Sequence, residues 1–140
     1  MEKTKRFLGL DVGDKRIGVA ISDELGLTAQ PIMTLERQSL EKDCDVLNEL
    51  IQKYQISKIV VGVPRSLSMR ITPQTQKVLD LVEIFKQKWS IPIEEWNEWY
   101  STQSAESVLI EADMSRKKRK KVIDKLAAVI ILQGYLDSHP

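Results

Sequence analysis

The first residue that could do chemistry is Asp11, which interrupts the apolar stretch Phe7–Val12. Aspartates are rare inside strands, because the short polar side chain competes for backbone hydrogen bonds and is costly to bury without a partner. Alternation along the strand puts Gly9 and Asp11 on one face. If the small residues of the next strand share that face, a helix, a ligand or a metal ion can approach the carboxylate closely. The alternative is a carboxylate satisfied by nearby backbone groups or by Lys15 or Arg16.

A second acid, Asp124, lies on an otherwise apolar helical face near the end of the sequence. It precedes Ala127, Ala128 and Ile131 by three, four and seven residues, so the four side chains share one face of a predicted helix. We expect that face to pack on the sheet, where the charge needs a cation, a basic side chain or a metal ion as partner. The alternative is an aspartate in the first turn of a helix, favoured by the helix dipole.

Three further acids, Glu94, Glu95 and Glu98, surround the end of a predicted strand, and the residues alone do not choose among them. Carboxylates that converge from separate elements form an all-oxygen site, which suits Mg²⁺ or Mn²⁺ and not zinc. Such ions can activate water and stabilise the attacking and leaving oxygens of phosphodiester hydrolysis. Other chemistries are poorly supplied. The single histidine is His139, the penultimate residue, and neither GxxxxGK[ST] nor GxGxxG is present.

Basic residues gather just before Asp124. The stretch "SRKKRKK" holds six consecutive cations in a chain whose formal net charge is only +1. Alone, such a run is often a solvated helix face, but next to an acidic metal site it is expected to contact a nucleic-acid backbone. Arg70 is a further candidate for the same role. The predicted nucleic-acid-binding residues are Lys15, Arg16, Arg65, Arg116, Lys117, Lys118, Arg119, Lys120 and Lys121.

The elements that must position these residues follow from hydrophobic periodicity and turn residues. The predicted strands are 7–12, 16–22, 27–35, 58–64 and 91–96. The predicted helices are 40–54, one carrying the stripe Val78 to Trp89, one capped by Thr102 and ending at Ala112, and 118–136. A surface loop is expected at 64–73. This order predicts an α/β fold in one domain, residues 1–140, with a five-stranded mixed sheet, its first three strands antiparallel, flanked by helices.

Composition limits the remaining possibilities. The single cysteine, Cys44, excludes an internal disulfide and a multi-cysteine metal site, and fits a reducing compartment. The first residues do not form a signal peptide and no apolar run is long enough to cross a bilayer, so we expect a cytoplasmic protein with no membrane partner. Either a monomer or a homodimer is compatible with the sequence. Trp96, Trp99 and Tyr100 could serve an interface, a base-stacking surface or the core.

Four stretches together resemble the YqgF family, also called RuvX: "GLDVGDKRIGVAISD", "IVVGVP", "STQSAESVL" and "RKKVIDKLAAVIILQGYLD". The resemblance covers nearly the whole chain. It implies a ribonuclease H-like fold and a metal-dependent nuclease that processes the 5′ end of pre-16S ribosomal RNA, with resolution of four-way DNA junctions as the older proposal. It also implies that Asp11, Glu98 and Asp124 are the catalytic residues and bind Mg²⁺ or Mn²⁺.

The chain departs from the family pattern at two places. Asn97 and Trp99 stand where the family commonly has aspartate and arginine, and the loop after "GVP" lacks the usual glycines and asparagine. These losses motivate an alternative, a catalytically weakened assembly factor that docks on ribosomal RNA or ribosomal particles through the basic run. The opening motif also resembles actin-like ATPases and sugar kinases, which need a second lobe for which this chain has no room. The expected substrate is structured RNA or branched DNA.

Overall fold

A mixed five-stranded sheet forms the centre of the computed structural model, which describes residues 6–65 and 70–140. The strands lie in the order β3-β2-β1-β4-β5. The first three are antiparallel neighbours, whereas β4 runs parallel to β1 and β5 parallel to β4. The predicted α/β fold with a mixed sheet is therefore confirmed. The strands are β1 (Phe7–Val12), β2 (Arg16–Ser22), β3 (Ala29–Glu36), β4 (Lys58–Val63) and β5 (Ile93–Asn97).

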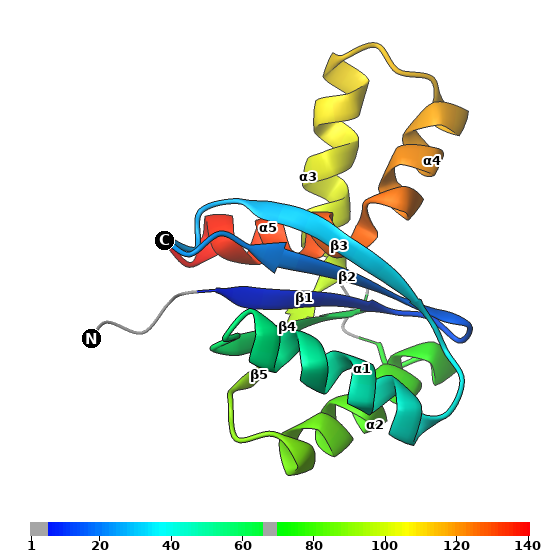
Figure 1. The fold of residues 1–140 in the computed structure, drawn as a ribbon. Helices are drawn as coiled ribbons and strands as arrows, with labels where there is room; N and C mark the ends of the chain where they lie inside the picture. Colours follow the sequence, from blue (N-terminus) through cyan, green and yellow to red (C-terminus); the bar gives the residue numbers. More distant parts are fainter. Residues whose placement is uncertain (1–5, 66–69) are drawn as a thin grey trace.

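Helices cover both faces of this sheet. Figure 1 shows α1 and α2 on one face and α5 on the other, while α3 and α4 run side by side and project beyond the sheet on the α5 side. The larger core lies between the sheet and α1 and α2, and a smaller one lies under α5. The helices are α1 (Leu40–Lys53), α2 (Pro73–Lys88), α3 (Glu98–Glu111), α4 (Arg116–Lys125) and α5 (Ala127–Ser138).

Several predicted boundaries differ from the structure, and three of these differences have a clear physical cause. The third strand begins at Ala29, because the side chain of Asp23 accepts hydrogen bonds from the amides of Leu27 and Thr28 and holds them in a turn. The third helix begins at Glu98, because Asn97 caps it directly at the strand end, its Oδ1 accepting from the Trp99 amide at 3.0 Å. Thr102 therefore lies inside the helix and is not its cap.

The third difference is a break in the last predicted helix. Leu126 (φ −108°, ψ 18°) separates α4 from α5, although the Ile130 amide still donates to its carbonyl. α4 packs against α3 while α5 lies along the sheet, and one straight helix cannot do both. The break therefore lets the α3–α4 hairpin project while α5 remains on the sheet.

The face that α5 covers is the small-residue face predicted from Asp11. Asp11 pairs with Gly18 and Gly9 with Ala20, which confirms that the small faces of β1 and β2 coincide. A Cβ added to Gly9 would lie 2.7 Å from the Cβ of Leu132 on α5, so only glycine allows this approach. In the described part of the chain, no helix is long and apolar enough to span a membrane.

Candidate active site

The carboxylates Asp11, Glu98 and Asp124 line one hollow of about 420 Å³ between the sheet and the helices α3, α4 and α5. Asp11 is the last residue but one of β1, and Glu98 is the first residue of α3, directly after β5. β4 separates those two strands. The Glu98 side chain lies against β4, since its Oε2 is 3.2 Å from the position that a Cβ on Gly62 would occupy. The fold thus brings together three acids that are far apart in the sequence.

Burial and mutual repulsion dominate the electrostatics of this hollow. Desolvation, followed by the negative charge of Asp11, raises the pKa of Glu98 to about 7. Desolvation, followed by the charge of Asp124, also raises the pKa of Asp11. Within 6–65 and 70–140, neither Asp11 nor Glu98 makes an ion pair. Arg16, offered above as a partner for Asp11, pairs instead with Glu36 at 2.9 Å.

The environment of Asp124 matches neither of the two that the sequence predicted. It is exposed, because the break at Leu126 turns α4 away from the sheet, so the expectation of a charge packed on the sheet is wrong. It lies in the last turn of α4, so the alternative of a first-turn aspartate is wrong as well. The acid instead stands at the rim of the hollow, one turn before Ala127 and Ala128 begin α5.

The hollow offers oxygen atoms, the type of donor that a hard divalent cation prefers. All three acids offer oxygen, which Mg²⁺ and Mn²⁺ prefer, and a cation between them would replace like-charge repulsion with attraction. Among the described residues, however, no three Asp, Glu, His or Cys side chains form a cluster tight enough to hold a metal ion. The acids therefore share a hollow without forming a compact triad.

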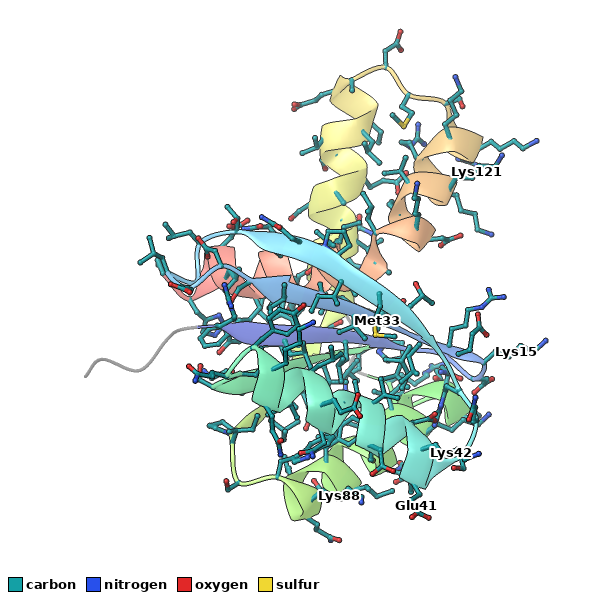
Figure 2. All side chains as sticks on the ribbon, in the orientation of Figure 1. Lys15, Met33, Glu41, Lys42, Lys88 and Lys121 are labelled. Atoms are coloured by element: carbon teal, nitrogen blue, oxygen red, sulfur yellow. The ribbon has the colours of Figure 1, made fainter. Side chains whose placement is uncertain are left out.

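The predicted basic residues take several different positions. Five of the six cations of the run are exposed on α4, and Figure 2 shows Lys121 and Lys15 extending on the same side of the molecule. Arg119 is half-buried. Its Nε lies 2.6 Å from Glu106 and its terminal nitrogen donates to the Met114 carbonyl at 2.7 Å, which ties α4 to α3. Arg119 therefore has a structural role in the α3–α4 hairpin, whereas the other five cations of the run are exposed.

Two further hollows adjoin the acids. One, of about 660 Å³, is lined by Asp11 and Asp124, by Lys15 and Arg16, and by Lys125. The other, of about 380 Å³, shares Glu98 and Thr102 with the acid hollow. Sequence reasoning missed Lys125, whose only signal was its position next to Asp124. It also missed Thr102 as a lining residue, because a threonine before a helical stretch is typical of a cap. The 380 Å³ hollow is lined by Pro64, Arg65, Arg70, Thr72, Glu98, Trp99 and Thr102.

Comparison with known proteins identifies the family of this chain. Residues 5–138 match the family model described as "RuvX: Holliday junction resolvase". A protein of Desulforamulus reducens named "Putative pre-16S rRNA nuclease" is 52% identical over 133 residues, 95% of this chain and 97% of that protein. A protein of the same name from Clostridioides difficile is 53% identical over 132 residues, 94% of each chain.

Solved structures share the architecture at low sequence identity. Thermus thermophilus RuvC, in complex with a Holliday junction substrate, superposes with a TM-score of 0.56 at 13% identity over 96% of both chains. The yeast mitochondrial Holliday junction resolvase Ydc2 gives a TM-score of 0.51 at 13% identity, over 97% of this chain and 79% of that one. These likenesses show the ribonuclease H-like fold. Together with the family match and the relatives at half identity, they establish that this chain belongs to the RuvX family of nucleases.

Proposed function

We propose that this protein is a divalent-metal-dependent nuclease that cleaves structured RNA and processes the 5′ end of pre-16S ribosomal RNA. The observation that carries the proposal is the hollow in which Asp11, Glu98 and Asp124 lie together, with the first two half-buried and paired to no cation among the described residues. The choice of RNA rests on the relatives at 52% and 53% identity, which are named for that substrate.

The residues of the hollow have distinct tasks in this reaction. Mg²⁺ or Mn²⁺, when bound, supplies an activated water and stabilises charge on the scissile phosphate. Asp11, near the end of β1, and Glu98, directly after β5, would hold that ion, since the strand backbone fixes their positions. Asp124 supplies oxygen from the rim. Lys15 and Lys125, in the adjoining hollow, hold the substrate phosphates close to the acids.

The replaced family aspartate does not favour the weakened assembly factor over the enzyme. Asn97 caps α3 through its Oδ1 and is not among the residues that line the hollow. An aspartate there would perform the same capping. Its replacement by asparagine therefore removes no carboxylate from the proposed metal site.

The test compares cleavage of a pre-16S rRNA leader fragment and of a four-way DNA junction with Mg²⁺, with Mn²⁺ and with a chelator. We expect metal-dependent cleavage of the RNA, reduced on the order of 10³-fold by Asp11→Asn or Asp124→Asn, since metal catalysis supplies several kcal/mol of barrier. Asp14→Asn is the matched control, because Asp14 is exposed and pairs with Lys77 outside the hollow.

Two outcomes would reject this proposal in favour of a named alternative. Cleavage of the junction but not of the RNA indicates a resolvase acting on DNA, as the description of the family model has it. Salt-sensitive RNA or ribosomal-particle binding that survives Asp11→Asn, without cleavage under any metal, indicates an assembly factor. Undiminished cleavage by both variants shows that the catalytic residues are wrongly assigned.

A further inference from the structure

Three adjoining hollows cross the candidate active site. Asp11 and Asp124 line both the acid hollow and the larger hollow beside Lys15. Glu98 and Thr102 line both the acid hollow and the 380 Å³ hollow, which continues on the other side. The acids therefore occupy the middle of a row, with cations beyond them in both directions. A polymer whose scissile phosphate lies at the acids extends into the hollows on either side.

The 380 Å³ hollow combines an aromatic ring with cations. Trp99, Arg65 and Arg70 are among the residues that line it. The volume is within the range of about 300–1,000 Å³ that is usual for small-ligand sites. An aromatic surface beside guanidinium groups suits a nucleotide, because the ring can stack on a base while the cations contact phosphate.

Arg65 has unused hydrogen-bonding capacity at this place. Its Nε is buried and has no hydrogen-bond partner among the residues described, while a terminal nitrogen lies 3.5 Å from Glu95. A buried donor without a partner is unfavourable. The Nε itself is out of reach of a ligand, but the Arg65 side chain is 22% exposed, so its guanidinium can contact a bound phosphate through its terminal nitrogens and neutralise the phosphate charge.

The Trp99 ring is held in place by its neighbours. Its amide donates to Asn97 Oδ1, which fixes the first turn of α3, and Tyr100 packs edge-on against the ring with centroids 5.4 Å apart and planes at 83°. A ring fixed before binding loses little entropy when a base stacks on it. Trp99 is therefore suited to present a stacking surface next to Glu98.

We propose, on the basis of the function proposed above, that this hollow binds the unpaired nucleotide next to the scissile phosphate. Its base stacks on Trp99, and its phosphate contacts Arg65 and Arg70. The departure from the family at Trp99 thus exchanges one cation for a stacking surface, while the two arginines keep the positive charge. The protein then prefers a strand that is unpaired at this position over a continuous duplex.

The test removes the base and the ring separately and together. The probe is a labelled RNA strand of about 12 nucleotides, within the roughly 4–16 that single-strand-binding modules cover, with one abasic position moved along it. Binding is measured by anisotropy to Asp11→Asn and to Asp11→Asn with Trp99→Ala, with the strand checked for integrity. Trp99→Ala should weaken binding of the complete strand roughly 5- to 150-fold. At one abasic position that difference should disappear.

Three controls make the result specific. Trp99→Phe should restore most of the binding, and Trp89→Phe, a matched change on a ring that packs on Phe85 away from the hollow, should leave binding unchanged. The same strand as DNA tests whether the sugar matters. Thermal unfolding of each variant tests whether it is folded; if Trp99→Ala is not, Trp99→Leu takes its place.

The inference is overturned if Trp99→Ala has no effect, if it weakens binding equally at every abasic position, or if the protein binds no strand at all. Its failure is distinguishable from failure of the proposed nuclease. Coupling between Trp99 and one base, in a protein with intact Asp11 that cleaves nothing, supports the nucleotide site and rejects the nuclease. Cleavage without that coupling rejects the nucleotide site alone.

Discussion

Glu94 and Glu98 are four residues apart, yet the fold puts them in opposite environments. Glu94 lies near the start of β5, where its carboxylate accepts a hydrogen bond from Tyr135 at 2.5 Å and pairs with Lys58 at 3.2 Å. Chiefly through the Tyr135 hydrogen bond, its pKa is lowered. Glu98, just beyond the end of β5, is desolvated and faces Asp11, so its pKa is raised to about 7. Glu94 is thus paired within the fold, whereas Glu98 has no ion-pair partner in the described part of the chain.

The two ends of α5 account in part for the different environments of Glu94 and Glu98. The C-terminal part of the helix carries Tyr135, whose hydroxyl accepts a hydrogen bond from Lys58 at 2.8 Å. The N-terminal part begins with the small residues Ala127 and Ala128, and Ala127 lines the hollow beside the acids. A charge that has partners stabilises the fold, whereas a buried charge without them destabilises it and points to a functional site. The same helix therefore provides both environments.

The largest difference between the two acids is expected in catalysis. Glu98→Gln should lower metal-dependent RNA cleavage on the order of 10³-fold, because it removes a proposed oxygen ligand of the metal from the hollow. Glu94→Gln should leave cleavage within a few-fold of the parent, because Glu94 does not line the hollow. Single-turnover cleavage rates of the two variants measure this. Equal losses would show that the distinction between the acids is not functional.

The next largest difference is expected in the pH dependence of stability without metal. The folded protein holds a proton on Glu98 up to about pH 7, whereas the unfolded chain releases it near 4.5. Between these values the folded state binds more protons, so stability falls as the pH rises. The loss is on the order of 2–3 kcal/mol by pH 8. Urea unfolding at pH 5 and pH 8, in chelator, measures it.

Glu98→Gln should remove most of this slope and stabilise the metal-free protein at pH 8. Added Mg²⁺ should stabilise the parent at pH 8 more than it stabilises this variant, since a ligand specific to the folded state raises its stability. A slope that is the same in parent and variant would mean that another group titrates. Glu94→Gln is the matched comparison, because its pKa is lowered and not raised.

A smaller effect is expected at the paired end of α5. Tyr135→Phe removes one hydroxyl that bonds both Lys58 and Glu94, at the cost of about 1–2 kcal/mol of unfolding free energy. Cleavage should be unchanged, because these groups lie outside the hollow. Denaturant unfolding and cleavage rates measured on the same preparation separate the two. Lost cleavage with unchanged stability would reverse the roles assigned to the two ends.

The smallest effect is expected at Glu95, the third acid of the same segment. It pairs with Arg65 at 3.5 Å, but its side chain is 38% exposed, and such pairs contribute little. Glu95→Gln should change the unfolding free energy by less than about 0.5 kcal/mol and leave cleavage within a few-fold. A large change in either quantity would show that Arg65 depends on this partner.

Much of the fold could be predicted because its signals are local. Alternation in β1 and β2 predicts which residues share a face, and the register Asp11 to Gly18 confirms it. Helical spacing predicts α1 with Cys44 and Leu47 buried. The predicted boundaries that were wrong, near Glu98 and Leu126, depend on contacts with neighbouring elements of the fold. A strand end supplied a cap at one, and two packing partners divided one helical stretch at the other.

The sequence by itself determined the mixed sheet, the small-residue face around Asp11 and the presence of isolated acids with too few local partners. The tertiary structure decided which of those acids meet. The sequence does not distinguish Glu94, Glu95 and Glu98, because a carboxylate's role depends on the groups around it, and those groups come from β1, β4, the residues just after β4, and α5. Only the folded chain pairs Glu94 with Lys58 and Tyr135, places Glu95 beside Arg65, and leaves Glu98 facing Asp11.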